Sequence, residues 1–295
     1  MKYVLAGASG FLGKALARDL VANGHQVLRL VRRPPSGPDE VRWDPARGDL
    51  DPAALGDPDV LVNLAGANIG RPWTPTYRMT IRESRVSTTA TLAAAATRLD
   101  RRPVLLTQSG IGGYGTDLGD RILTEDSDLG EGFLSDVVRL WEGALEPARE
   151  AGSRVAALRT GVVLDSKAPA FQLLSLPFRI GLGGRLGPGT QYFPVVSLTD
   201  WIRAVQHVAE NDSVSGPVNI TLPTPATNQE LTEALATALH RPSLVPVPAI
   251  LMKAALGEFA WELLGSKRAL PTRLQSTGFT FHHPTVTAAI SAALA

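Results

Sequence analysis

The sequence contains no cysteine, which excludes disulfide bonds and thiolate metal sites. Its 29 lysines and arginines nearly balance its 28 aspartates and glutamates, so it lacks the basic field that would hold nucleic acid or an anionic membrane. No apolar run approaches the roughly 20 residues of a membrane span, and no leader-like pattern follows Met1. We therefore expect a cytoplasmic protein whose partner is a small molecule.

Apolar runs of strand length alternate with helical patterns through the first half of the chain. Buried strands joined by helices predict a parallel sheet covered on both faces, that is, a doubly wound α/β fold of the Rossmann type. Strands are predicted at Tyr3–Ala6, Val27–Val31, Val60–Leu64, Val104–Thr107 and Val155–Leu158, and helices at Leu12–Val21, Thr76–Leu99 and Phe133–Ala151.

The second half of the chain changes character after a Gly/Pro-rich stretch at 181–188. Short strands are predicted at "GPVNIT" (216–221) and "GFTFHH" (278–283), and a final block of mixed structure begins near Arg241. We predict a nucleotide-binding domain at 1–165 to which 195–222 return. Residues 166–194 and 223–295 are predicted to form a smaller C-terminal α+β lobe on the substrate side.

Three glycines, Gly7, Gly10 and Gly13, follow a predicted strand and open a predicted helix, which is the context of a dinucleotide-binding turn. The neighbouring residues expected to line the cofactor are Ser9, Phe11 and Leu12. A phosphate loop of the nucleotide triphosphatase type is disfavoured because Ala8 and Ala15 stand where glycine and a magnesium-binding hydroxyl are needed. The alternative is a glycine turn with no ligand.

Two arginines end the second predicted strand where an NAD site usually offers an acid to the ribose. No acid lies between Asp19 and Asp39, whereas Arg32 and Arg33 suit a 2′-phosphate, which a guanidinium binds bidentately. This pattern predicts NADP(H) as the cofactor. The alternative is a pair of solvated loop arginines.

Several longer segments resemble the extended short-chain dehydrogenase/reductase superfamily. They are "DVLVNLAG" (59–66), "LTQSGIGGYG" (106–115) and "LRTGVVL" (158–164). Together with "RPWTPTYRMTIRESRVSTT" (71–89), "GLGGRLGPGTQYF" (181–193) and the block at 241–285, they look like the atypical epimerase-family proteins. Those proteins are described as sugar-nucleotide epimerase-like and carry a C-terminal domain of unknown function. The resemblance implies a Rossmann fold and NADP(H) binding.

The resemblance also implies roles for residues at the strand ends. Leu64, Ala65 and Gly66 would line the cofactor, and the small residues Ala65 and Gly66 would let a dinucleotide pass close to the strand. Ser109 matches the active-site Ser/Thr position, where a hydroxyl would bond a substrate carbonyl or alcohol, although it could instead cap a glycine-rich turn. Tyr114 matches a loop tyrosine near the nicotinamide, or packs in the interior.

The chain departs from the superfamily at its Tyr-x-x-x-Lys pair, in which the lysine lowers the tyrosine pKa for proton transfer. With the helix anchored on Glu142, Leu134 stands at the tyrosine position and Val138 at the lysine position. Both are expected to face the nicotinamide side of a cleft and to make that wall apolar. Asp136 is a weak substitute because we expect it to face solvent.

Arginines at helical spacing follow a predicted helix start at Thr74 and Pro75. The substrate-binding candidates are Asn68, Arg82 and Arg85, and Arg159 is a further cofactor candidate. For the arginines the alternative is a solvated surface. The five histidines lack ligand spacing, so no metal is predicted.

The sequence therefore predicts an NADP(H)-binding oxidoreductase or epimerase-like protein that acts on an unidentified small polar substrate. The alternative is a non-catalytic NADP(H)-binding sensor or scaffold, in which chemistry was lost with the tyrosine and lysine. A homodimer through the helices at 76–99 and 133–151 is possible, since alanines 90 and 93–96 permit close helix approach. The same alanines could instead pack inside the monomer.

Overall fold

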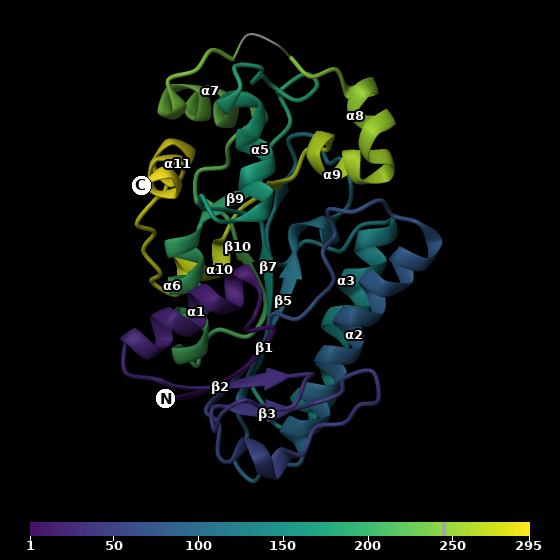
Figure 1. Ribbon diagram of the computed structural model, residues 1–295, viewed down its shortest axis with the longest axis vertical. Coiled ribbons are helices and arrows are strands. Elements are labelled where there is room, and N and C mark those ends of the chain that lie inside the picture. The colour runs from purple at the N-terminus through teal and green to yellow at the C-terminus, as the bar shows by residue number, and fades with distance from the viewer. Residues whose placement is uncertain (244–245) are drawn as a thin grey trace.

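The computed structural model describes residues 1–243 and 246–295, in which seven parallel strands form the central sheet (Figure 1). The strand order is β10-β7-β5-β4-β1-β2-β3, so the chain winds outward in both directions from the β1–β4 boundary. The strands are β1 (Lys2–Ala6), β2 (Gln26–Val31), β3 (Glu40–Arg42), β4 (Val60–Asn63), β5 (Val104–Gly110), β7 (Val155–Thr160) and β10 (Gly216–Ile220). The predicted Rossmann-type α/β fold is confirmed.

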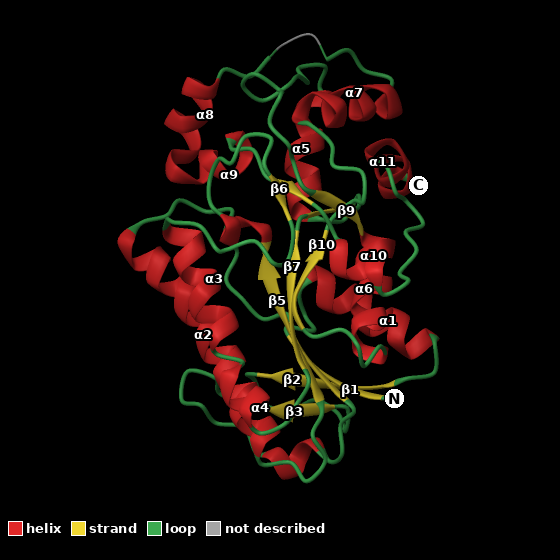
Figure 2. Cartoon of the chain, turned by 180° about the vertical axis from the view of Figure 1, so that it is seen from behind, coloured by secondary structure: helices red, strands yellow, loops and turns green. Residues whose placement is uncertain are grey.

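Helices cover both faces of this sheet (Figure 2). One face carries α1 (Phe11–Ala22), α6 (Leu198–Glu210) and α10 (Thr272–Ser276), and the other carries α2 (Pro75–Thr97), α3 (Phe133–Gly143) and α4 (Glu146–Glu150). Successive side chains of a strand point to opposite faces, so Tyr3 and Leu5 join the core under α1, while Val4 and Ala6 join the core under α2. Both faces are therefore apolar, as non-alternating strands predict.

The alanine-rich end of α2 packs inside the molecule. Ala93, Ala95 and Ala96 are buried in the core shared with the sheet, whereas Ala90 and Ala94 are exposed. This burial favours packing of these alanines inside the monomer over their contact with a second copy of the chain. At its other end α2 begins as predicted, with Thr74 capping the amide of Tyr77.

Two of the predicted secondary-structure elements were wrong. The expected helix at 133–151 is divided, because α3 ends at Gly143 and a new helix, α4, begins at Glu146 with Pro147 in its first turn, the only turn of a helix that readily accepts proline. The stretch 278–283 is not a strand. The amides of His282 and His283 donate to the carboxylate of Asp200 (both 2.8 Å) instead of to a neighbouring strand.

The C-terminal half packs a third apolar core above the carboxyl edge of the sheet. Its elements are α5 (Pro169–Arg179), α7 (Asn228–Leu239), α11 (Val286–Leu294) and the strand pair β8 (Val162–Leu164) and β9 (Val195–Ser197). A second strand pair, β6 (Ile122–Leu123) with β11 (Arg268–Ala269), joins the two halves. The helices α8 (Ala249–Leu256) and α9 (Ala260–Leu264) lie near the start of α3 (Figure 1).

Of the final block predicted from Arg241, residues 244–245 lie outside the described residues. No helix in the described ranges is long and apolar enough to cross a membrane.

Candidate active site

The turn after β1 is packed so tightly that two of its three glycines leave no room for a side chain. Gly7 has a φ of 80°, and a Cβ there would lie 2.6 Å from the carbonyl carbon of Leu64. A Cβ on Gly13 would lie 2.3 Å from the carbonyl oxygen of Gly7. Gly10 is exposed, and its Cβ would meet that same oxygen only at 3.3 Å. The turn therefore draws β1, β4 and α1 together and leaves the start of α1 open.

The open start of α1 fits the phosphates of a dinucleotide. Gly10 is the N-cap residue and has no side chain to bond the first amides, so these amides and the positive end of the helix dipole are available to an anion. Ser9 is exposed, while Phe11 and Leu12 are half-buried and pack against the core. The site lies where strand order reverses, between β1 and β4, which is where open α/β sheets bind ligands.

The turn after β4 is held by a buried amide. Asn63 is fully buried, and its Nδ2 donates to the hydroxyls of Thr88 (3.0 Å) and Thr89 (2.8 Å). Its Oδ1 accepts from the amide of Ala65 (3.1 Å). Asn63 thereby fixes the segment Leu64–Gly66 against α2, close to the glycine turn. The sequence analysis did not single out this asparagine, although a polar residue ending a wholly apolar strand was a signal.

The two arginines after β2 have different surroundings. Arg33 donates to both carboxylate oxygens of Glu40 (2.7 and 2.8 Å), whose side chain is only 2% exposed. Hydrogen bonds from Arg33 and the amide of Ser36 lower the pKa of Glu40 to about 2. Arg32 is exposed and forms no hydrogen bond or ion pair within the ranges that the structure describes. Arg33 is thus committed to a structural pair, and Arg32 remains the candidate for a 2′-phosphate.

Ser109, at the end of β5, belongs to a buried polar group. Its hydroxyl donates to Oε1 of Glu142 on α3 (2.7 Å). The same carboxylate accepts from Nε (2.9 Å) and Nη2 (2.8 Å) of Arg159 on β7. Burial acts to lower the pKa of Arg159, but the pair with Glu142 raises it overall. The structure thus places Arg159, a cofactor candidate from the sequence, in an internal ion pair with Glu142.

Glu142 is a site residue that the sequence analysis used only as an anchor. It follows Val138 by four residues, so it continues the buried face of α3. A carboxylate on that face needs a partner, and this was the signal that could have found the pair.

Tyr114 lies in the interior. It is 1% exposed, and its hydroxyl lies 2.9 Å from the carbonyl oxygen of Thr124 and 2.8 Å from Oδ1 of Asn219. Burial raises the pKa of Tyr114, and the guanidinium of Arg159 stacks on its ring at 4.9 Å. These contacts favour the packing alternative for Tyr114 over proton transfer.

The arginines of α2 do not form one charged surface. Arg85 donates to the carbonyl oxygens of Ile81 and Ala67 (both 3.0 Å) and lies over the ring of Trp141 at 5.1 Å. Burial lowers the pKa of Arg85 to about 10. Arg85 supports the turn at Gly66 through the carbonyl of Ala67, the neighbour of Asn68. Asn68 and Arg82 are exposed.

A cleft of ≈ 250 Å³ separates the start of α3 from α9. Its lining residues are Trp73, Gly112, Thr116, Glu131, Gly132, Phe133, Leu134, Ser135, Glu258, Trp261 and Glu262. Leu134 therefore borders a cleft, as expected. Val138 does not: it is 4% exposed and packs against Gly113 in the interior, so that part of the prediction was wrong. Asp136 is exposed and pairs with Arg139 (2.8 Å), as expected.

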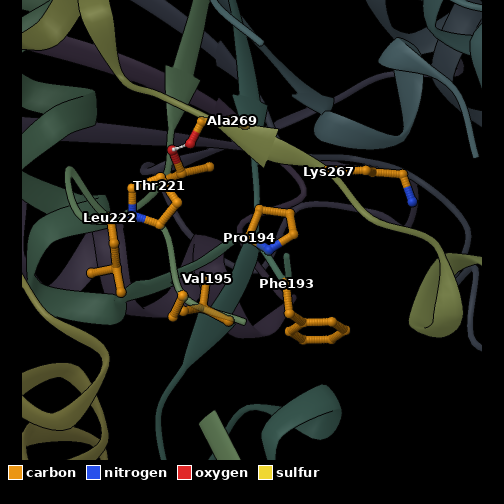
Figure 3. A pocket seen from close by; sticks show the side chains of 9 residues that line it. Phe193, Pro194, Val195, Thr221, Leu222, Lys267 and Ala269 are labelled. Carbon is orange, nitrogen blue, oxygen red and sulfur yellow. Dashed lines mark hydrogen bonds between the residues drawn. The ribbon is translucent and has the colours of Figure 1, made fainter. Parts of the chain in front are cut away.

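A second cavity, between β9 and the end of β10, is too small for a substrate. Its volume is ≈ 10 Å³, about the space of one water molecule. Figure 3 shows it walled by Phe193 and Val195, with the hydroxyl of Thr221 donating to the carbonyl oxygen of Ala269 (3.2 Å). The amine of Lys267 points away from it, toward Glu262 of the larger cleft (3.3 Å).

The sheet, its glycine turn and the strand ends define a dinucleotide-binding protein of the short-chain dehydrogenase/reductase type. Residues 3–131 match the NAD dependent epimerase/dehydratase family, and residues 247–293 match a domain of unknown function, DUF1731. An epimerase family protein of Mycobacterium leprae is 42% identical over 289 residues, 97% of this chain and 94% of the relative. Bovine epimerase family protein SDR39U1 is 36% identical over the whole of both chains. The chain belongs to this epimerase family.

Solved structures agree with this assignment. Human SDR39U1, whose crystal structure contains NADPH, superposes with a TM-score of 0.90 at 34% identity and covers 99% of this chain and 98% of its own. A nucleoside-diphosphate sugar epimerase of Corynebacterium glutamicum gives a TM-score of 0.84 at 34% identity, with 58% of that chain covered. UDP-glucose 4-epimerase of Thermotoga maritima, at 16% identity and a TM-score of 0.77, shares the fold.

Proposed function

We propose that the protein binds NADP(H) in preference to NAD(H) and acts as an oxidoreductase or epimerase-like enzyme on a small polar substrate held in the cleft beside α3. The observation that carries the cofactor preference is Arg32, which is exposed after β2 at the place where NAD-binding proteins keep an acid. The NADPH in the structure of human SDR39U1 supports the same preference.

Each part of the site has a role in this proposal. The amides at the start of α1 hold the pyrophosphate, Arg32 binds the 2′-phosphate, and Ala65 and Gly66 let the dinucleotide pass. A bound nicotinamide supplies or accepts hydride. Ser109 does not line the cleft beside α3, and its hydroxyl, which donates to Glu142, instead steadies the end of β5 beside it.

Cofactor preference is the direct test. NADPH is expected to bind more tightly than NADH by about 1.5–3 kcal/mol, the worth of a charge-assisted hydrogen bond, or roughly 10–150-fold in Kd. Arg32→Asp should erase or reverse this difference. Arg179→Asp, the same charge change at the exposed end of α5, should leave it intact. Equal Kd values for the two cofactors in the native protein would refute the proposal.

A second function, NADP(H) binding without turnover, is favoured by the apolar Leu134 at the tyrosine position and by the engaged hydroxyl of Tyr114. General acid catalysis typically contributes 10²–10⁴-fold, so its loss would leave a slow enzyme or none. Incubation with NADPH and a panel of aldehydes, ketones and nucleotide sugars, followed by absorbance of the reduced nicotinamide, separates the two functions. Turnover above the solvent background rejects the sensor.

A further inference from the structure

The helix α5 is apolar on two opposite faces, of which only one is covered. Phe171 and Phe178 are buried in the core that α5 shares with α7 and α11. The outer face of α5 consists of Leu173, Leu176 and Ile180, which recur at helical spacing and are 60%, 54% and 64% exposed. A helix that is apolar all round is normally enclosed, so this outer face lacks a partner among the described residues.

Neighbouring elements add exposed apolar side chains at this end of the molecule. Leu182, just after α5, is 58% exposed. The helix α8 lies at the same end of the molecule as α5 (Figure 1), and its Ile250 and Leu251 are 75% and 60% exposed. Single exposed apolar residues are common on protein surfaces, whereas several at one end of a molecule indicate a contact surface.

The charges along this segment have one sign. Lys167 precedes α5, Arg179 ends it and Arg185 follows it, and all three are exposed. Within residues 1–243 and 246–295, their side chains form no hydrogen bond or ion pair. From 166 to 199 the sequence contains no aspartate or glutamate. The charges of the whole chain nearly balance, so this segment holds a local surplus of positive charge beside an apolar face.

The carboxylates of the adjoining elements already accept hydrogen bonds. Asp165 accepts from the amide of Lys167 (2.8 Å). On α7, Glu230 closes the capping box at the helix start, and Glu233 accepts from Gln229 (2.9 Å). In the described part of the chain, these carboxylates thus have partners, whereas the cations along α5 do not.

We propose that the outer face of α5 binds the surface of an anionic lipid bilayer, with its apolar side chains among the acyl chains and with Lys167 and Arg179 at the phosphate headgroups. A helix that lies in a membrane interface combines an apolar face with lysines and arginines beside it, which is the pattern of α5. This inference is independent of the cofactor and of the cleft beside α3.

A second copy of the chain fits this face less well than a bilayer does. A two-fold dimer brings the same face of both copies together. Lys167 and Arg179 of one copy would then approach those of the other, and the segment 166–199 offers no acid to separate them. Anionic headgroups supply the missing negative charge, so a bilayer satisfies both the apolar side chains and the cations.

Vesicle co-sedimentation tests the proposal with the full chain. We expect the protein to pellet at low salt with vesicles of equimolar phosphatidylcholine and phosphatidylglycerol, to stay in solution with phosphatidylcholine alone, and to be released by high salt. Leu176→Asp should lower the partition coefficient on anionic vesicles at least about tenfold, because it removes a leucine from the apolar contact. Arg179→Gln should lower it about fivefold, the effect of one cation at the surface.

Matched variants on other helices give the controls. Val21 is 61% exposed near the end of α1, much as Leu176 is near the end of α5, so Val21→Asp should leave the partition coefficient unchanged. Arg98→Gln, at the exposed end of α2, should leave it unchanged as well. Circular dichroism of each variant checks that it folds.

The other outcomes overturn the inference. They are an absence of pelleting with anionic vesicles at low salt, equal pelleting with neutral vesicles, a control variant that binds as weakly as Leu176→Asp, and a folded Leu176→Asp or Arg179→Gln that binds as tightly as the native protein. If Leu176→Asp does not fold, Arg179→Gln decides. Light scattering that finds a dimer of the native protein and a monomer of Leu176→Asp would assign the face to a second copy instead.

Discussion

Glu142→Gln should strongly destabilise the protein because it removes one partner of a buried ion pair. The side chain of Arg159 is 6% exposed and that of Glu142 is 16% exposed, so water replaces little of the lost interaction. Removing one partner of such a pair typically costs about 3–5 kcal/mol of unfolding free energy. We expect about 3 kcal/mol, at the lower end, because the glutamine amide oxygen can still accept one hydrogen bond from the guanidinium.

A matched exposed pair gives the control. Arg149 and Glu146 on α4 are each 49% exposed, and such pairs contribute about 0–1 kcal/mol. Glu146→Gln should therefore shift the urea midpoint only slightly. The free energies of unfolding come from urea titrations followed by both circular dichroism and tryptophan fluorescence, whose coincidence tests for a single transition.

Two results would refute this reasoning. One is a loss in Glu142→Gln within about 1 kcal/mol of the loss in Glu146→Gln. The other is a double replacement, Glu142→Leu with Arg159→Met, that is no more stable than Glu142→Gln, because exchanging both partners for apolar groups should recover most of the loss.

Two further predictions concern the cofactor side of the sheet. The hydrogen bond from Arg33 lowers the pKa of Glu40 from 4.5 to about 2. The native protein should therefore be more stable than Glu40→Gln by its full margin above pH 4.5, and this margin should be lost as the pH falls toward 2. Urea midpoints measured across this pH range test the prediction. Gly13→Ala should lower the free energy of unfolding, measured by urea titration, because its Cβ would lie 2.3 Å from a carbonyl oxygen. Gly143→Ala, whose Cβ would meet nothing within 4 Å, should raise the free energy of unfolding by up to about 1 kcal/mol through helix propensity. A Gly13→Ala variant as stable as the native protein would contradict the close packing of the turn.

The parts of the fold that the sequence predicts are those encoded locally. β1, β4 and β7 are buried on both faces, so each stands out as an unbroken apolar run. β3 was not predicted because its three residues include a glutamate and an arginine. Its place at the sheet edge depends on pairing with β2, which no local pattern records.

The site divides in the same way. The glycine spacing predicts the turn because the conformation of Gly7 and the closeness of Gly13 are requirements on single positions. Arg32 and Arg33 are indistinguishable in the sequence as candidates for the 2′-phosphate. The pairing of Arg33 with Glu40 leaves Arg32 as the candidate, and this pairing depends on how β2 and β3 pack, which the local sequence does not record.

At the start of α3, the resemblance to the superfamily predicts one site position correctly and another wrongly. Leu134 and Val138 are one turn apart, and comparison with the tyrosine and lysine of the superfamily predicts that both face the cleft. The structure places only Leu134 there, because Cγ1 of Val138 lies 2.6 Å from where a Cβ of Gly113 would stand. A lysine at 138 would bury its ammonium against the turn after β5 with large loss of hydration. Restoring the lost pair therefore requires a different backbone at Gly113.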